Sequence, residues 1–245
     1  TIEPGVGTAR WQFFAPWSPA AGMVAIIHLL CAIEEKDGKR KAIGICAALI
    51  IALFSQSRLA MVAIALIWPI SWGVSRLGKP STWFAGVVPL LLGGLFAPAI
   101  LAFLEKAQSD FSGARADSSR VRSVLGHIAV ERWQHEAYWF GHGIVERGPH
   151  IVEFMPIGSH HSWYGLLFVK GMCGLIAFAI PIGSTLFSCF LAAMKRDVGR
   201  VGLSMILVYF LYSFGENMET LVYLCWPALV IVGIALRHPT PAAAP

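Results

Sequence analysis

The sequence predicts an all-α polytopic membrane protein, with about seven transmembrane helices and one long external loop between the fourth and fifth. Three observations lead to this fold class. Of the 245 residues, 56% are hydrophobic and only 13% are charged, which is about half the charged fraction of an ordinary soluble domain. The mean hydropathy is +0.65. The apolar residues form continuous runs, whereas a membrane β-barrel alternates apolar and polar residues in segments of about ten. A soluble enzyme, a disordered chain and a nucleic-acid binder are therefore disfavoured.

Each predicted span is a run close to the roughly 20 apolar residues that cross a bilayer. The seven runs lie at residues 17–33, 42–55, 59–74, 82–104, 162–192, 201–214 and 219–236. The second, third and sixth runs are short, which is tolerated where irregular backbone lines a cavity. Residues 1–245 are expected to be a single membrane domain, the C-terminal part of a longer chain. Residues 105–161 are expected to be its extracytoplasmic loop.

The distribution of lysine and arginine predicts how the spans are oriented. One set of connections, at residues 34–41, 75–79 and 195–200 together with Arg237, carries ten basic and four acidic residues, a net charge of +6. The connections on the other side carry eight basic and ten acidic residues, a net charge of −2. Because cytoplasmic loops are enriched in basic residues, the first set is predicted to be cytoplasmic. The N-terminus and the long loop then face the outside.

Arg58 follows one apolar run and precedes the next, in the sequence Ser55-Gln56-Ser57-Arg58. An arginine near the middle of a membrane is costly, by about 2.5–3.5 kcal/mol on insertion scales. One interpretation is an interfacial arginine whose side chain reaches the lipid headgroups. The other is an anion site, because a guanidinium fits phosphate oxygens with two hydrogen bonds. The hydroxyl of Ser57 is then a further donor to the ligand.

Residues 116–133 predict an external helix whose N-cap lies among residues 117–119. Arg120 and Arg122 fall in its first turn. They are two residues apart and point in different directions, so one of them at most faces a given site. A phosphate-binding role and a solvated, headgroup-facing role are both open for these arginines.

Residues 140–165 predict an irregular loop that ends in a histidine pair at the start of the fifth span. Gly141 and Gly143 mark a tight turn within it. His160 and His161 are candidates for a general base, because imidazole takes up a proton near neutral pH. A purely structural role for this pair remains open. No metal site is predicted, because no further ligands follow at a familiar spacing and the five cysteines lie inside apolar runs.

Together these pieces resemble the family of O-antigen ligases and Wzy-type O-antigen and exopolysaccharide polymerases. The shared elements are the Ser55–Arg58 segment, an arginine-bearing external segment that leads to Gly141-His142-Gly143, and the histidine at the start of a span. His160 takes the place of the family's histidine, with Gly171 eleven residues later. His161 stands where asparagine is usual in the family. The resemblance covers roughly residues 43–190.

The resemblance implies a GT-C-like, metal-independent and inverting glycosyltransferase of the bacterial inner membrane that needs no cofactor. The implied donor is an oligosaccharide on undecaprenyl pyrophosphate. The implied acceptor is a sugar hydroxyl on a second lipid-linked glycan (polymerase) or on lipid A-core (ligase), and a chain-length regulator protein is a possible partner. The predicted pyrophosphate-binding residues are Arg58, Arg120 and Arg122, and the predicted catalytic residues are His160 and His161. Ser57, Gly141 and Gly143 are weaker substrate-binding candidates.

Two other functions fit parts of the sequence. A transporter or permease would place its substrate path at the broken helices around Arg58, since interrupted helices often build transport sites. A structural subunit of an envelope complex is the second alternative. The sequence does not separate a polymerase from a ligase.

Overall fold

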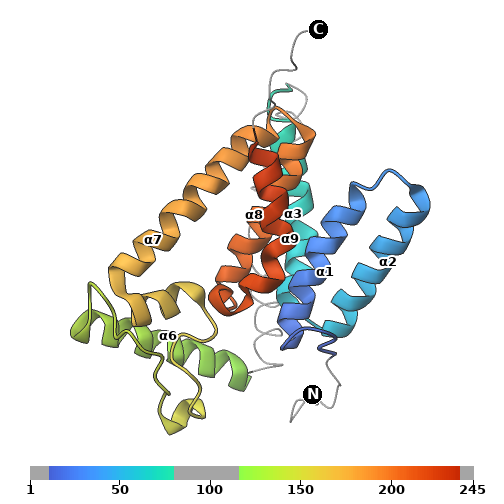
Figure 1. Cartoon of the computed structure of the whole chain (residues 1–245). Coiled ribbons are helices and arrows are strands. Elements are labelled where there is room, and N and C mark those ends of the chain that lie inside the picture. Colours follow the sequence, from blue (N-terminus) through green and yellow to red (C-terminus); the bar gives the residue numbers. More distant parts are fainter. Residues whose placement is uncertain (1–10, 80–115, 238–245) are drawn as a thin grey trace, which may run out of the picture. The chain divides into compact units, whose positions relative to one another are not determined.

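A computed structural model describes residues 11–79 and 116–237 of the chain. Within these residues the backbone is helical apart from connecting loops and one isolated antiparallel bridge between Arg147 and Pro156. Figure 1 shows the elements, which are α1 (Ser18–Ile33), α2 (Gly38–Ser55), α3 (Arg58–Ser75), α6 (Ala116–Glu136), the 3₁₀ helix η1 (His150–Val152), α7 (Ser162–Ala193), α8 (Asp197–Ser213) and α9 (Met218–Leu236).

The helices occupy six of the seven predicted apolar runs. The remaining run, residues 82–104, lies outside the described residues. Of the described helices, α3, α7 and α9 are long and apolar enough to cross a membrane. Helix α1 is equally apolar but has 16 residues. The all-helical membrane class is therefore supported, and the count of seven spans stays a prediction.

Helices α2 and α3 extend beyond the second and third apolar runs. Both α2 and α3 contain 18 residues. Helix α2 begins earlier than its apolar run because Asp37 caps it: the Asp37 carboxylate accepts a hydrogen bond from the backbone N–H of Lys39 at 2.9 Å. The first turn of α2 is therefore polar and basic, a signal that an apolar-run criterion leaves out.

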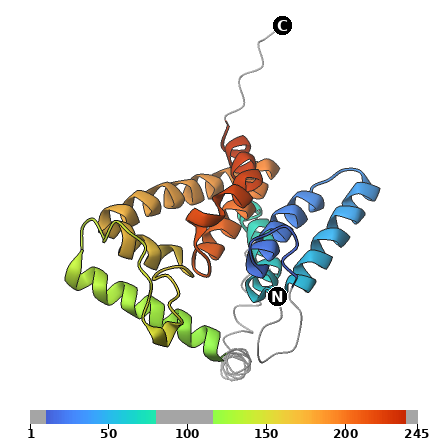
Figure 2. The same cartoon turned by 60° about the horizontal axis from the view of Figure 1, so that its bottom comes forward.

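The chain divides into two compact units, and the first contains residues 1–75 and 177–245. Within this unit α1 contacts α2, α3, α8 and α9. Figures 1 and 2 both show α1 beside α2, and α8 beside α9. Helix α1 is buried on nearly all sides, which explains why its sequence is apolar around its whole circumference. Its core partners include Met205, Tyr212 and Leu221.

Small residues allow close packing of helices in this unit. A Cβ atom on Gly22 of α1 would lie 2.7 Å from the Cβ atom of Ser57, and one on Gly202 would meet the side chain of Ala235. Such small residues let helix backbones approach closely, as is common in membrane bundles. A buried hydrogen bond of 2.8 Å from the Ser204 hydroxyl to the Ser71 hydroxyl also links α8 to α3.

Basic side chains gather where α1 and α9 end and α8 begins. The guanidinium of Arg200 binds the Glu34 carboxylate at 2.8 Å. The Arg196 guanidinium donates to the carbonyl of Ala235 at 2.8 Å. The Lys41 ammonium donates to the last turn of α1 at the Ile33 carbonyl. Arg196 and Lys41 thus satisfy carbonyl groups that a helix C-terminus leaves without partners.

The second unit contains residues 76–176. One stripe of α6 is buried against η1 and the first turns of α7, and its core consists of Val121, Leu125, Ala129, Val152, Ile157 and Phe168. A helix is thus confirmed in this region, its external placement stays a prediction, and its predicted start was wrong. Helix α6 begins at Ala116, so residues 117–119 lie inside its first turn, and Arg120 and Arg122 follow that turn.

Candidate functional site

The break between α2 and α3 holds the predicted Ser55–Arg58 element. Gln56 adopts a left-handed conformation with φ of 49°, which ends α2. The buried Ser57 hydroxyl accepts from the backbone N–H of Ala60 at 3.3 Å, so it caps the start of α3. Arg58 is the first residue of α3 and is partly buried. The structure therefore gives Ser57 a capping role, and its predicted role in substrate binding stays a prediction.

A buried carboxylate lies close to this break, within the same unit. Glu216, in the connection from α8 to α9, is only 3% exposed. The indole N–H of Trp17 donates to it at 2.9 Å. Tyr212 is fully buried next to Glu216 and Ser57. Buried carboxylates need such partners, so Glu216 holds the first turn of α1 against the α8–α9 connection.

In the second unit, Arg122 lies near enough to His160 for its charge to act on the imidazole. Arg122 lies on the exposed side of α6, and His160 is half-buried just before α7. Burial lowers the pKa of His160 to about 4, and the positive charge of Arg122 contributes to the same direction. Arg120 is exposed too, but it is two residues away, about 200° around the helix. The charge of Arg122 acts on His160, and the choice between Arg120 and Arg122 as the phosphate-binding residue stays a prediction.

His161 has a structural role at the beginning of α7. Its ring Nδ1 accepts from the backbone N–H of Tyr164 at 3.5 Å, and its ring stacks on the Tyr164 ring with centroids 4.0 Å apart. Burial lowers the pKa of His161, which favours the neutral ring that such a cap requires. Of the two predicted histidines, His160 is the better candidate for a base.

The loop that contains Gly141 and Gly143 fills a break in α7. At Gly171 the helix has φ of 63° and ψ of −160°, which is not helical. The backbone N–H groups of His142 and Gly143 donate to the carbonyls of Phe168 and Val169, each at 2.9 Å. Beyond the break, the N–H groups of Met172 and Cys173 donate to the carbonyls of Tyr138 and Trp139, at 2.9 and 3.0 Å. The loop thus supplies the partners that the interrupted helix lacks.

Glycine is required where the loop and the break meet. A Cβ atom on Gly141 would lie 2.5 Å from the backbone nitrogens of Lys170 and Gly171. A Cβ atom on Gly171 would lie 2.5 Å from the backbone of Trp139 and Gly141. Both residues also have positive φ. The geometry explains Gly141 as a packing requirement, and the predicted substrate-binding role of Gly141 and Gly143 remains untested.

A network of charged side chains fastens this loop to α6. The Arg132 guanidinium binds Glu136 at 2.8 Å and Glu146 at 2.6 Å. His142 faces the carboxylate of Glu136 at 2.8 Å through one ring nitrogen and the carbonyl of Phe168 at 3.0 Å through the other. Hydrogen bonds from Arg132, then from His142, lower the pKa of Glu136 to about 2. Arg132 lowers the pKa of Glu146 as well, and both carboxylates raise the pKa of Arg132.

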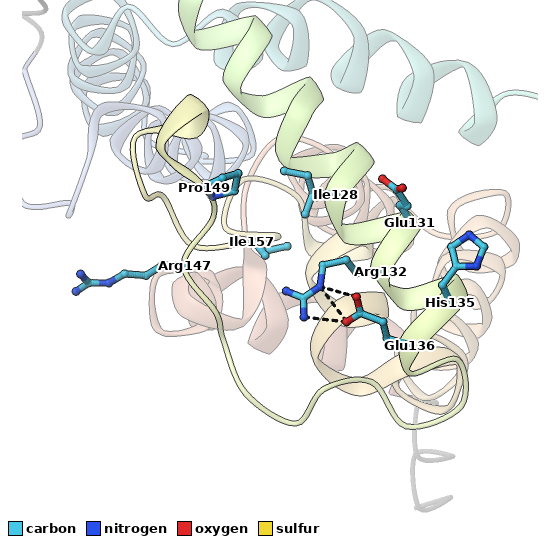
Figure 3. A pocket seen from close by; sticks show the side chains of 8 residues that line it. All are labelled: Ile128, Glu131, Arg132, His135, Glu136, Arg147, Pro149 and Ile157. Atoms are coloured by element: carbon cyan, nitrogen blue, oxygen red, sulfur yellow. Dashed lines mark hydrogen bonds and ion pairs between the residues drawn. The ribbon is translucent and has the colours of Figure 1, made fainter.

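A pocket of about 410 Å³ opens beside this network. Its lining residues are Ile128, Glu131, Arg132, His135, Glu136, Arg147, Pro149 and Ile157. Figure 3 shows Arg132 and Glu136 facing each other along α6, whereas Arg147 points away from them. The volume falls within the roughly 300–1,000 Å³ of small-molecule sites. Its lining combines charged side chains with the apolar Ile128, Pro149 and Ile157.

We expect Glu136→Gln to loosen the loop at its attachment to α7. Amide hydrogen exchange at His142 and Gly143 should become faster, by a factor below about five because the pair is largely solvent-exposed. In the parent protein, this stabilisation is present above about pH 4.5 and is lost as the pH falls toward about 2, because the pKa of Glu136 is lowered in the folded state. Glu131→Gln, on an exposed neighbour in the same helix, is the control. Equal exchange in both variants would contradict the assigned role.

The predicted site residues are divided between the two units. Arg122 and His160 belong to the second unit, and Arg58 and Ser57 belong to the first. In the described ranges, no three histidine, cysteine or acidic side chains gather as metal ligands would. The Arg132 network was missed, although the spacing of Arg132 and Glu136, four residues apart, is a readable helix pair.

No protein-family model matches this chain, and a search of curated proteins also gave no match.

Proposed function

We propose that the protein is a membrane glycosyltransferase that polymerises or transfers a glycan carried on undecaprenyl pyrophosphate, at the periplasmic face of the bacterial inner membrane. The observation that carries this proposal is the pairing of Arg122 with His160. The charge of the Arg122 guanidinium acts on a half-buried imidazole at the start of an apolar helix. A guanidinium can stabilise the charge on a diphosphate leaving group. An imidazole can take the proton from an acceptor hydroxyl.

The reaction assigns each group a step. The acceptor oxygen forms a bond to the anomeric carbon, the bond from that carbon to the pyrophosphate oxygen breaks, and undecaprenyl pyrophosphate leaves. The hydroxyl proton passes to the His160 ring. Arg122 stabilises the charge that develops on the pyrophosphate. Attack from the side opposite the leaving group inverts the anomeric centre.

The low pKa of His160 fits a base that is activated by its substrate. In the free protein, burial and Arg122 hold this pKa near 4, which makes the imidazole a weak base. A diphosphate bound at Arg122 offsets the positive field and raises the pKa of His160 toward neutrality. His160 therefore becomes a stronger base once the donor is in place. Arg58 and Arg120 enter the proposal through the family resemblance.

The proposed topology has seven spans with the N-terminus outside and the C-terminus in the cytoplasm. Within the first unit, Arg196, Arg200 and Lys41 gather at one end of the helices. This clustering supports the assignment of that end to the cytoplasmic side. Trp17 and Glu216 then belong to the external end of the unit.

A reconstituted transfer assay tests the proposal. The full chain in liposomes is given an undecaprenyl-pyrophosphate-linked oligosaccharide, with a second lipid-linked glycan or lipid A-core as the acceptor. Product mass distinguishes a polymerase from a ligase. Arg122→Gln is expected to reduce transfer by about 10²–10³-fold, because it removes a donor to the developing charge. Ser123→Ala, on an exposed neighbour in α6, is the matched control. Undiminished transfer by Arg122→Gln would contradict the mechanism.

The break between α2 and α3 supports a second candidate, a permease. Interrupted helices supply backbone groups for substrates in transporters, and the break at Gln56 next to Arg58 is such an interruption. Uptake of a labelled solute into the same liposomes, without consumption of the lipid-linked donor, would favour it.

A further inference from the structure

The second unit carries an exposed apolar segment that the proposed reaction does not use. We name residues 138–145 the aromatic loop. Trp139 is 60% exposed and Phe140 is 78% exposed, and Ile144 and Val145 are also exposed. Scattered exposed apolar residues are common on proteins, but here they are consecutive or nearly so. A contiguous patch of this kind indicates a contact surface.

The aromatic loop presents almost no charge. Its one basic side chain, His142, is only 11% exposed and turns inward onto Phe168, where the two rings stack with centroids 4.3 Å apart. The outward-facing residues are therefore aromatic or aliphatic. A surface for a water-soluble partner carries a polar rim, whereas a lipid surface favours this composition.

The attachment of the loop fixes its position along α7. The backbone groups of residues 138–143 pair with α7 on both sides of the break at Gly171. From residue 172 the helix continues to Ala193 with helical dihedral angles. That length extends roughly 33 Å at ~1.5 Å per residue, which matches the ~30 Å hydrocarbon core of a bilayer. The break therefore marks the level of one membrane surface.

Basic residues flank residues 172–193 of α7 at both ends, as expected if the break at Gly171 lies at a membrane surface. Lys170 is exposed immediately before the break, where its ammonium can reach the headgroups. Lys195 and Arg196 follow the other end. Tryptophan and tyrosine are the residues that collect at the membrane–water interface, and the aromatic loop places Tyr138 and Trp139 there.

We infer that the aromatic loop is a lipid-contacting element, with Trp139 and Phe140 inserted among phospholipids at the boundary between headgroups and acyl chains. The inference rests on α7 crossing the membrane and does not require the transfer reaction. Its consequence is that the end of α6 and the adjoining pocket are held at the lipid surface. A lipid-linked molecule could then reach the pocket without leaving the membrane.

Photocrosslinking tests the inference in the full chain, reconstituted in phosphatidylethanolamine–phosphatidylglycerol nanodiscs. p-Benzoylphenylalanine is placed at Phe140 and, in a second variant, at Trp139. The control position is Phe154, which is 55% exposed and equally aromatic but follows the exposed Glu153. After irradiation, mass spectrometry is expected to find phospholipid adducts at 140 and 139, and background levels at 154.

Three results would overturn the inference. The first is a crosslink from both loop positions to another segment of the chain or to a second copy, with no lipid adduct. The second is the absence of any adduct at both loop positions while the probe remains reactive. The third is equal lipid labelling at 154, which would show that exposure alone decides the outcome. Because none of these readouts uses glycan transfer, failure here is distinguishable from failure of the proposed function.

Discussion

Replacing His160 with glutamine is expected to slow glycan transfer by about 10²–10⁴-fold, the usual contribution of a general base. Glutamine keeps a polar side chain but cannot accept the acceptor's proton in the reaction. Binding of the donor should be almost unaffected, because Arg122 remains. Single-turnover transfer in proteoliposomes measures the chemical step, and retention of bound lipid-linked donor measures binding.

The matched control is His161→Asn. The ring of His161 accepts a backbone N–H at the start of α7, and asparagine is among the best N-cap residues. Transfer by His161→Asn should therefore stay within severalfold of the parent rate. If His161→Asn greatly reduces the transfer rate and His160→Gln does not, His161 is the general base and His160 is not.

The dependence of transfer on pH follows from the same geometry. A general base must be neutral, so kcat/KM rises with pH through the pKa of His160 in the free protein. Because burial and Arg122 lower that pKa to about 4, no acidic limb from His160 is expected between about pH 5 and 8. In Arg122→Gln the residual activity should show its acidic limb at a higher pH, because the positive charge of Arg122 no longer lowers the pKa of His160. If the acidic limb of Arg122→Gln lies at the same pH as in the parent protein, Arg122 does not influence the base.

The apolar runs predicted the positions of the helices because burial in lipid or in a helical core requires continuous apolar sequence. The starts of α2 and α6 were less predictable. Helix α2 starts in a basic stretch through the cap at Asp37, and α6 starts at Ala116, before the residues that appeared to be its cap. Such starts depend on local hydrogen bonds that an apolar pattern does not encode.

The sequence was sufficient to propose which residues belong to the candidate site, but not to predict which of them interact with one another. The sequence identified Arg122, His160 and the Gly141–Gly143 turn separately. Only the folded chain shows that the charge of Arg122 acts on His160, and that the turn satisfies the broken backbone of α7. Residues 142 and 168 are far apart in sequence, so no local periodicity relates them. The Gly141-His142-Gly143 motif therefore suggested ligand binding. The structure instead explains Gly141 by the close approach of its backbone to Lys170 and Gly171.

Gly171→Ala is expected to destabilise the second unit strongly. The left-handed φ and extended ψ at this residue are accessible almost only to glycine, and such strain costs on the order of 1–3 kcal/mol. The new Cβ atom would also lie 2.5 Å from the backbone of Trp139 and Gly141. These backbone atoms cannot relieve the overlap by changing rotamer, as a flexible side chain can. The loop must therefore leave the break, and four backbone hydrogen bonds lose their partners.

Two further glycines separate the causes of this destabilisation. Gly143→Ala adds a methyl group at a positive φ of 73° with no atom within 4 Å, so it tests backbone strain alone. Gly183→Ala adds one in open space within α7 and should be neutral or stabilising by up to about 1 kcal/mol, because alanine favours the helix. Thermal unfolding monitored by size-exclusion chromatography should rank the midpoints Gly183→Ala highest, Gly143→Ala next and Gly171→Ala lowest. If Gly171→Ala unfolds at the same temperature as Gly183→Ala, the loop does not fill the break. The exposed aromatic residues would then lose their fixed level along α7, and with it their assigned contact with lipid.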